Sequence, residues 1–193
     1  MSTNIAVFAS GNGNGYEALL EAIKSSKLNA KIVVVISNNQ NAKILHKADN
    51  EKIPTYVINS KNTQENKIDD KLLDILKSFH VDYIFLSGYM KMISPKLIKQ
   101  YQNKIINTHP SLLPKFGGQG MYGRYVHEAV IESKEKVSGV TVHFVDEIYD
   151  NGEIILQKSV HITKDETVDS LEIKVKYIEQ KAIVEAFATL LVP

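Results

Sequence analysis

Short apolar runs of strand length alternate with segments of helical period through the first half of this chain. That alternation is typical of βαβ units and of a mainly parallel sheet. The expected strands are residues 5–9, 32–37, 55–57, 83–86 and 104–107, and the expected helices are residues 16–24, 42–51, 65–78 and 95–101. We therefore predict an α/β fold with a doubly wound, Rossmann-like sheet.

The pattern changes in the second half of the chain. Residues 137–145 alternate, with Val140, Val142 and Phe144 on one face, and a second strand is expected at residues 153–161. Two strands joined by a short turn predict an antiparallel pair added to the parallel sheet. A long amphipathic helix over residues 168–191 is expected to close the chain.

Length and composition predict one soluble domain over residues 1–193, because a chain of this size can bury a core of its own. The 23 basic and 22 acidic residues give no electrostatic reason to expect a nucleic-acid partner. No apolar run is long enough to span a bilayer, and the amino terminus lacks the features of a signal peptide. With no cysteine in the sequence, a cytoplasmic location is expected.

A glycine-rich segment at residues 10–15 connects the first expected strand to the first expected helix. Backbone N–H groups in such a loop can bind a phosphate at the positive end of a helix. It is a poor dinucleotide motif, because Tyr16 stands where the third glycine should be and residues 37–39 lack an acidic ribose ligand. From the loop alone, a tight turn without a ligand is the commoner interpretation.

Asn107 and His109 follow a short apolar run, in a proline-bounded segment expected to be a loop at the carboxyl end of a buried strand. An amide can donate to an oxyanion, and an imidazole with a pKa near ~6.5 can move protons at neutral pH. A carboxylate beside the imidazole would orient it, but spacing alone does not decide between Asp146, Glu147 and Asp150. A lone histidine in such a loop is more often a structural hydrogen-bonding group.

Residues 107–116, NTHPSLLPKF, resemble the signature of the formyltransferases that use 10-formyltetrahydrofolate. Further similarity follows in order at residues 10–13, 86–94, 142–146 and 150–152, so that it covers essentially the whole chain. The resemblance implies the formyltransferase fold and an enzyme of purine biosynthesis. It also implies 10-formyltetrahydrofolate as cosubstrate and the amine of 5-phosphoribosylglycinamide as acceptor, both of them small molecules.

The resemblance also implies roles for individual residues. It implies that Asn107, His109 and Asp150 are catalytic and that His143 supports them. Those implied for the acceptor substrate are Gly11, Asn12, Gly13, Asn14 and Gly15 at its phosphate and Glu179 at its amine. Those implied for the folate are Met90, Lys91, Met92, Ile93 and Asn107.

The chain departs from the family pattern in three places. Lys91 replaces a residue that is commonly arginine, and Asn14-Gly15 stand where many members have serine and asparagine. The segment 117–124 is longer and richer in glycine, which predicts a mobile lid to which no specific contact is assigned.

The remaining histidines show no metal-ligand spacing, so we predict no metal site. Solvated or capping roles are expected for His46, His80, His127 and His161.

Several alternative functions share parts of these motifs. A formyltetrahydrofolate hydrolase is expected to carry an extra region before the first strand, whereas Ile5 already begins the sheet here. Methionyl-tRNA formyltransferase is expected to continue into a nucleic-acid-binding domain. A noncatalytic nucleotide- or folate-binding module on the same fold is the alternative from another class. A dinucleotide oxidoreductase ranks lower, and the sequence does not specify the oligomeric state.

Overall fold

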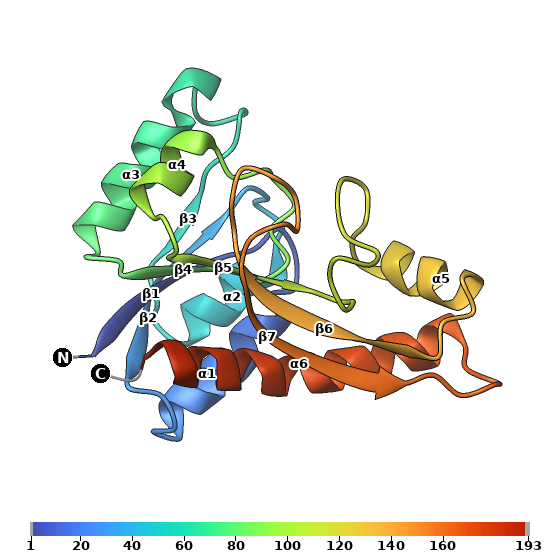
Figure 1. Cartoon of the computed structure of the whole chain (residues 1–193). Helices are drawn as coiled ribbons and strands as arrows, with labels where there is room; N and C mark the ends of the chain where they lie inside the picture. Colours follow the sequence, from blue (N-terminus) through green and yellow to red (C-terminus); the bar gives the residue numbers. More distant parts are fainter. Residues whose placement is uncertain (1, 192–193) are drawn as a thin grey trace.

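The computed structural model describes residues 2–191, which form one seven-stranded sheet of order β3-β2-β1-β4-β5-β6-β7 (Figure 1). The strands are β1 (Thr3–Phe8), β2 (Ala30–Ser37), β3 (Thr55–Val57), β4 (Tyr83–Leu86), β5 (Ile105–His109), β6 (Val137–Phe144) and β7 (Ile154–His161). The first five are parallel, whereas β6 is antiparallel to β5 and β7 is antiparallel to β6. The predicted α/β fold with an added antiparallel pair is confirmed.

Helices cover both faces of the sheet, as a doubly wound fold requires (Figure 1). They are α1 (Asn14–Lys24), α2 (Lys43–Asn50), α3 (Ile68–Ser78), α4 (Pro95–Gln100), α5 (Arg124–Glu132) and α6 (Val168–Leu190), with a single 3₁₀ turn, η1 (Glu65–Lys67). The helices α1, α2, α5 and α6 contribute to one apolar cluster, and α3 and α4 contribute to the other. None of the described helices combines the length and hydropathy needed to cross a membrane.

Successive residues of the inner strands point into different clusters. Ile5 and Val7 of β1 belong to the cluster beneath α1 and α6, while Ala6 and Phe8 belong to the cluster beneath α3 and α4. All four are fully buried. Side chains alternate along a strand, so a strand covered on both faces is apolar throughout instead of alternating, which explains the continuous apolar runs in the sequence.

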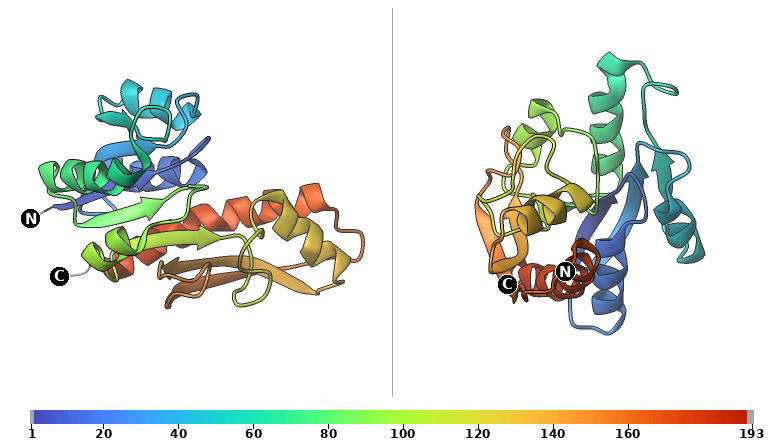
Figure 2. Two further views of the ribbon diagram at one scale, coloured as in Figure 1. Left: turned by 90° about the horizontal axis from the view of Figure 1, so that it is seen from above. Right: turned by 90° about the vertical axis from the view of Figure 1, so that its right-hand side faces the viewer.

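The long helix α6 packs against α1, β6 and β7, and the left view of Figure 2 shows it running alongside the strands. It begins at a capping box, in which the Thr167 hydroxyl accepts from the backbone N–H of Ser170 and the Ser170 hydroxyl accepts from that of Thr167. Its buried residues are Leu171, Val175, Ala182, Ile183, Ala186 and Phe187. They recur at three- and four-residue spacing, so one face of α6 is anchored to the sheet.

The structure confirms the expected strand as far as Asn107 and corrects the expectation that His109 lies in a loop. Both belong to β5, which continues to His109 because it pairs with β6, where Asn107 is opposite His143 and His109 is opposite Thr141. A strand holds side chains more firmly than a loop does. The two residues therefore have positions that are fixed by the sheet.

Helix α5 has no counterpart among the expected elements. It starts after Gly123, whose φ of 53° places it in the left-handed region, and buries Val126, His127 and Val130. It is only nine residues long and lacks a side-chain cap. Packing against α6 stabilises it, and local sequence gives little sign of that contact.

Candidate active site

One cavity of about 670 Å³ opens at the carboxyl ends of β1, β4 and β5. Its walls come from residues 12–15, 86–93, 107–110 and 118–123, and from the side of α6 that bears Glu179. Open α/β sheets bind ligands at this edge, where the loops after neighbouring parallel strands meet. The volume lies within the range of about 300–1,000 Å³ that is typical of small-molecule sites.

His109 lies in the wall of this cavity with its imidazole almost completely buried. The Nε2 atom lies 2.7 Å from the carbonyl oxygen of Phe116, and Nδ1 lies 3.4 Å from Oδ2 of Asp150. A carbonyl can only accept, so the hydrogen of the neutral ring is assigned to Nε2. Burial lowers the pKa of His109, while the Asp150 carboxylate and the Phe116 carbonyl oppose that shift.

Asp150 stands in the turn between β6 and β7, in the left-handed region at φ 54°. Its Oδ2 accepts a hydrogen bond of 3.0 Å from the backbone N–H of Gly118, and its Oδ1 lies 3.7 Å from Nε2 of His143. Asp146, by contrast, accepts from groups of its own turn, including the backbone N–H of Ile148. Of the three acidic residues that the sequence left open, Asp150 is therefore the one that approaches His109.

Asn107 is oriented by His143 of the neighbouring strand. Its Nδ2 donates to Nε2 of His143 at 3.2 Å, and Nδ1 of His143 donates to the carbonyl oxygen of Phe144 at 2.8 Å. Each ring nitrogen thus has one partner, which fixes the tautomer of His143 and the direction of the Asn107 amide. One N–H of that amide remains for a ligand in the cavity.

The glycine loop enters α1 through a turn that only glycine accommodates well. Gly13 has φ 63°, and a Cβ atom there would lie 2.5 Å from Cδ1 of Ile44. Residues 12–15 line the cavity, whereas Gly11 is absent from its wall, and its carbonyl accepts from the N–H of Ile44. Four of the five residues expected at the phosphate are thus brought to the cavity.

A lysine from α2 supports this loop. Lys47 Nζ donates to the carbonyl oxygen of Asn12 at 3.0 Å and lies 3.1 Å from Oε2 of Glu17. The carbonyl of Asn12 is thereby directed toward α2. N–H groups at the start of α1, which have no partner within the helix, carry the positive end of its dipole.

Glu179 of α6 lines the same cavity and accepts a hydrogen bond of 2.7 Å from the Thr108 hydroxyl. Burial raises the pKa of Glu179, and the Thr108 hydroxyl and the charge of Lys176 act in the opposite direction. Glutamate side chains that are shielded from water are usually paired with a cation. The observed partner of Glu179 is a hydroxyl group on β5.

The segment expected at the folate follows β4 and forms one rim of the cavity. Met90 and Met92 are 52% and 57% exposed, so they do not serve as core residues, whereas Ile93 is buried. Lys91 is exposed and also lines the cavity. Flexible thioethers next to an apolar side chain make an adaptable surface for a flat ring.

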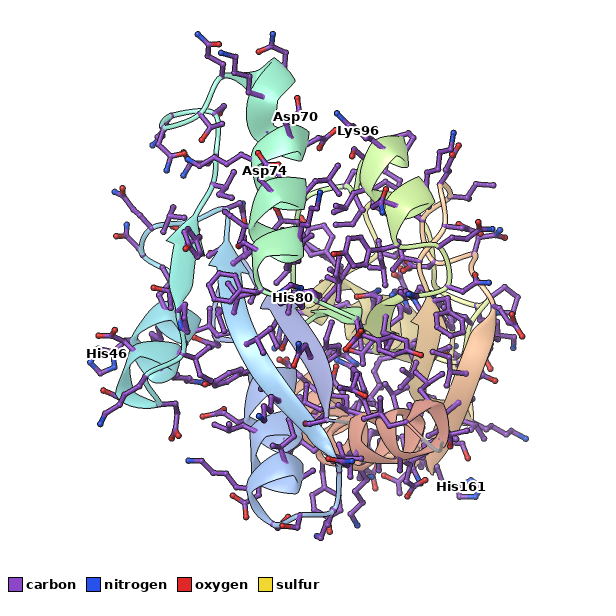
Figure 3. The ribbon with its side chains drawn as sticks, turned by 90° about the vertical axis from the view of Figure 1, so that its left-hand side faces the viewer. His46, Asp70, Asp74, His80, Lys96 and His161 are labelled. Carbon is purple, nitrogen blue, oxygen red and sulfur yellow. The ribbon has the colours of Figure 1, made fainter. Side chains whose placement is uncertain are left out.

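The histidines outside the β5–β6 pair differ in burial. His46, His80 and His161 are exposed, which confirms the expected solvated role, and Figure 3 shows His46 and His161 at the edges of the molecule. The same expectation is wrong for His127, which is 3% exposed and lines the cavity from α5. Because the helix itself was not foreseen, no sequence signal identified this histidine.

Within residues 2–191 no group of three or more histidine, cysteine or acidic side chains is arranged to hold a metal ion.

Known proteins similar to this chain point to one family. The formyl transferase family model matches residues 3–187. A Haemophilus influenzae phosphoribosylglycinamide formyltransferase is 40% identical over 173 residues, which are 89% of this chain and 79% of that protein. The crystal structure of glycinamide ribonucleotide transformylase 1 from Geobacillus kaustophilus superposes with a TM-score of 0.91 at 33% identity, covering 100% of both chains.

Longer relatives occur in plants. A chloroplastic phosphoribosylglycinamide formyltransferase of Vigna unguiculata is 38% identical over 187 residues, which are 96% of this chain but only 60% of that protein. For the corresponding protein of Arabidopsis thaliana the chain spans 63% of the length. Because the match extends over nearly the whole chain and the fold agrees, this chain belongs to the formyl transferase family.

Proposed function

We propose that the chain transfers the formyl group of 10-formyltetrahydrofolate to the amine of 5-phosphoribosylglycinamide, yielding the N-formyl product and tetrahydrofolate. The observation that carries the proposal is the placement of Asn107, His109 and Asp150 around one end of a cavity that also contains the glycine loop. The names of the Haemophilus and Geobacillus relatives support the same acceptor.

The acceptor is proposed to bind with its phosphate at residues 12–15, where backbone N–H groups at the start of α1 favour an anion. Its amine would then lie toward the end of β5, near Glu179 and Asn107. A carboxylate that accepts a hydrogen bond from the amine would hold the amine in position to attack the formyl carbon. Its contribution would be to orient the amine more than to supply charge.

The folate is proposed to bind along residues 90–93. The apolar side chains of this rim suit a flat heterocycle, and the exposed Lys91 offers a cation for a carboxylate tail. The cosubstrate supplies an electrophilic formyl carbon. The chain's own task is to place that carbon between Asn107 and the amine.

The proposed reaction forms a bond from the amine nitrogen to the formyl carbon and breaks the bond from that carbon to the folate nitrogen. The free N–H of Asn107 donates to the oxygen that becomes negatively charged. Nδ1 of His109, which carries no hydrogen in the neutral ring, accepts the proton that the amine loses and passes it to the departing nitrogen. Asp150 stabilises the imidazolium in between.

The proposal includes action in the cytoplasm on two small molecules, with no nucleic-acid or membrane partner. The near balance of 23 basic and 22 acidic residues supports the part that concerns nucleic acid.

The test follows folate absorbance on mixing the protein with 10-formyltetrahydrofolate, with and without 5-phosphoribosylglycinamide, for the wild type and for His109→Ala. Turnover that needs the acceptor and is lost in the variant is the expected result. Turnover without acceptor would favour a formyltetrahydrofolate hydrolase instead. Binding of both ligands without turnover would favour a noncatalytic module.

A further inference from the structure

Glu179 has an unusual environment for a carboxylate in a cavity wall. Within the described chain its one hydrogen-bond partner is the Thr108 hydroxyl, at 2.7 Å. Lys176, the lysine of the same helix whose charge acts on Glu179, makes an ion pair of 2.5 Å with Glu172, one turn in the other direction. Glu179 therefore keeps most of its acceptor positions open, because a carboxylate offers about four.

The other acidic side chains that line the cavity already have partners. Asp146 accepts from the backbone of its own turn, and Asp150 accepts from Gly118 and faces His109. Glu172 pairs with Lys176 and also lies 3.6 Å from Arg124. Of these carboxylates, Glu179 is thus the one that has neither a backbone donor nor an ion pair within the described chain, which leaves it available to a hydrogen-bond donor of a ligand.

Thr108 is suited to fix the direction of that carboxylate. It stands on β5 between Asn107 and His109 and is opposite Val142 of β6, so that its backbone is held by the sheet. Side chains alternate along the strand, which places Thr108 on the face of Ile106, beneath α6, and its two neighbours on the other. A β-branched side chain has few χ1 states, so its hydroxyl points in one direction.

We propose that Thr108 is a positioning residue that holds one oxygen of Glu179, so that the other oxygen is directed to an N–H or O–H group of the acceptor substrate. The inference rests on the proposed function, because it concerns the same acceptor. Asn107 and His109 act on the reacting atoms, while Thr108, between them in sequence, serves the binding of the acceptor through α6. On β5, the two residues of one face thus take part in the reaction, while the residue between them, on the other face, orients the acceptor.

The experiment compares kcat and KM for each substrate in the wild type, Thr108→Val, Thr108→Ser, Glu179→Gln and the Thr108→Val/Glu179→Gln double variant. Valine keeps the shape of threonine and removes the hydroxyl, whereas serine keeps the hydroxyl. Thr108→Val should raise KM for 5-phosphoribosylglycinamide about tenfold, since a hydrogen bond to a charged group is lost. KM for 10-formyltetrahydrofolate should stay unchanged, and Thr108→Ser should behave like the wild type.

The double variant distinguishes action through Glu179 from an independent effect. If Thr108 acts through Glu179, Thr108→Val adds little to the loss already caused by Glu179→Gln. The matched control is Thr55→Val, which makes the same change at an exposed position of β3, away from the cavity.

Three results would overturn the inference. The first is a Thr108→Val variant with unchanged kinetics. The second is a Thr108→Val substitution that raises KM for the acceptor equally in the wild type and in the Glu179→Gln variant. A lowered melting temperature in Thr108→Val, with wild-type KM values, would assign Thr108 a structural role only. A wild-type protein that turns over no 5-phosphoribosylglycinamide would instead refute the proposed function, and this inference with it.

Discussion

The imidazole Nδ1 of His109 and the carboxylate Oδ2 of Asp150 meet at 3.4 Å, although one residue ends β5 and the other stands in the turn between β6 and β7. Phe144 at the end of β6 is opposite Ile106, so the turn leaves the sheet beside the start of β5 and must fold back along β5 to bring Asp150 to His109. Burial keeps His109 neutral by lowering its pKa, so a proton that arrives there depends on Asp150 for stabilisation. The pair can therefore take up a proton briefly and release it.

Replacement of Asp150 should separate this chemistry from folding. Asp150→Asn removes the charge but keeps a residue that tolerates the left-handed backbone at φ 54°. We expect kcat to fall by about a hundredfold or more, the usual range for loss of acid–base assistance, with little change in the free energy of unfolding. Steady-state kinetics and urea denaturation would measure the two effects.

Asp146→Asn is the matched control, because Asp146 lies in the same turn and its carboxylate accepts from Ile148 and Asn151. This variant should keep the wild-type kcat. Equal losses in both variants would mean that the turn, and not the charge beside His109, limits the rate.

His143 should affect the rate through Asn107. His143→Leu removes the acceptor for Nδ2 of Asn107, so the amide is free to turn away from the cavity. We expect kcat to fall by about tenfold to a hundredfold, which is less than the loss expected when an oxyanion donor is removed outright. In an Asn107→Ala background the same substitution should have almost no further effect, and a full additional loss there would refute the role in positioning.

Much of the fold could be predicted from the sequence because its signals are local. The apolar runs that became β1, β2 and β4 are largely buried on both faces, and their periodicity differs clearly from that of the helices between them. The turn with Asp150 could be found as well, since two alternating strands flank it. Assigning Asp150 as the partner of His109 needed either the family resemblance or the structure.

What the sequence could not supply depends on packing between distant segments. The extension of β5 to His109 comes from pairing with β6, and the burial of His127 comes from the packing of α5 on α6. The Thr108–Glu179 contact also joins a strand to a helix far along the chain. Short segments such as these acquire their structure from contacts that no local pattern records.

The glycine loop allows a direct test of close packing. A Cβ atom on Gly15 would lie 2.7 Å from Cζ of Phe85 and 2.8 Å from Cδ1 of Ile183. Because Phe85 is fully buried, Gly15→Ala should lower the free energy of unfolding by about 1–3 kcal/mol, as overpacking does, less a gain of up to about 1 kcal/mol in helix propensity.

Gly11→Ala is the control for that measurement, since a Cβ atom on Gly11 would meet no atom within 4 Å. Urea denaturation should show it to be as stable as the wild type or slightly more so. If the two alanine variants unfolded at the same urea concentration, the close approach of Phe85 and Ile183 would not restrict the size of the side chain at position 15.

Three buried histidines should make the protein less stable as the pH falls. Burial lowers the pKa values of His109, His127 and His143 in the folded chain. In the unfolded chain the histidine pKa is about 6.5. Between the two values the unfolded chain binds more protons, so stability increases with pH across this window and is lost as the pH drops from about 6.5 through the folded pKa values.

His127→Gln isolates one of these contributions. His127 is suited to this because its Nδ1 has no hydrogen-bond partner and because the charges of Lys176 and Arg124 further lower its pKa, although Glu172 opposes them. The variant should lose less stability than the wild type between pH 7.5 and 5.5, as measured by urea denaturation at each pH. The difference between the free energies of unfolding of the two proteins at each pH cancels the contribution of the carboxylates, which both proteins contain. If the two curves ran parallel, His127 would have the same pKa in the folded and unfolded chains, and its burial between α5 and α6 would have no electrostatic consequence.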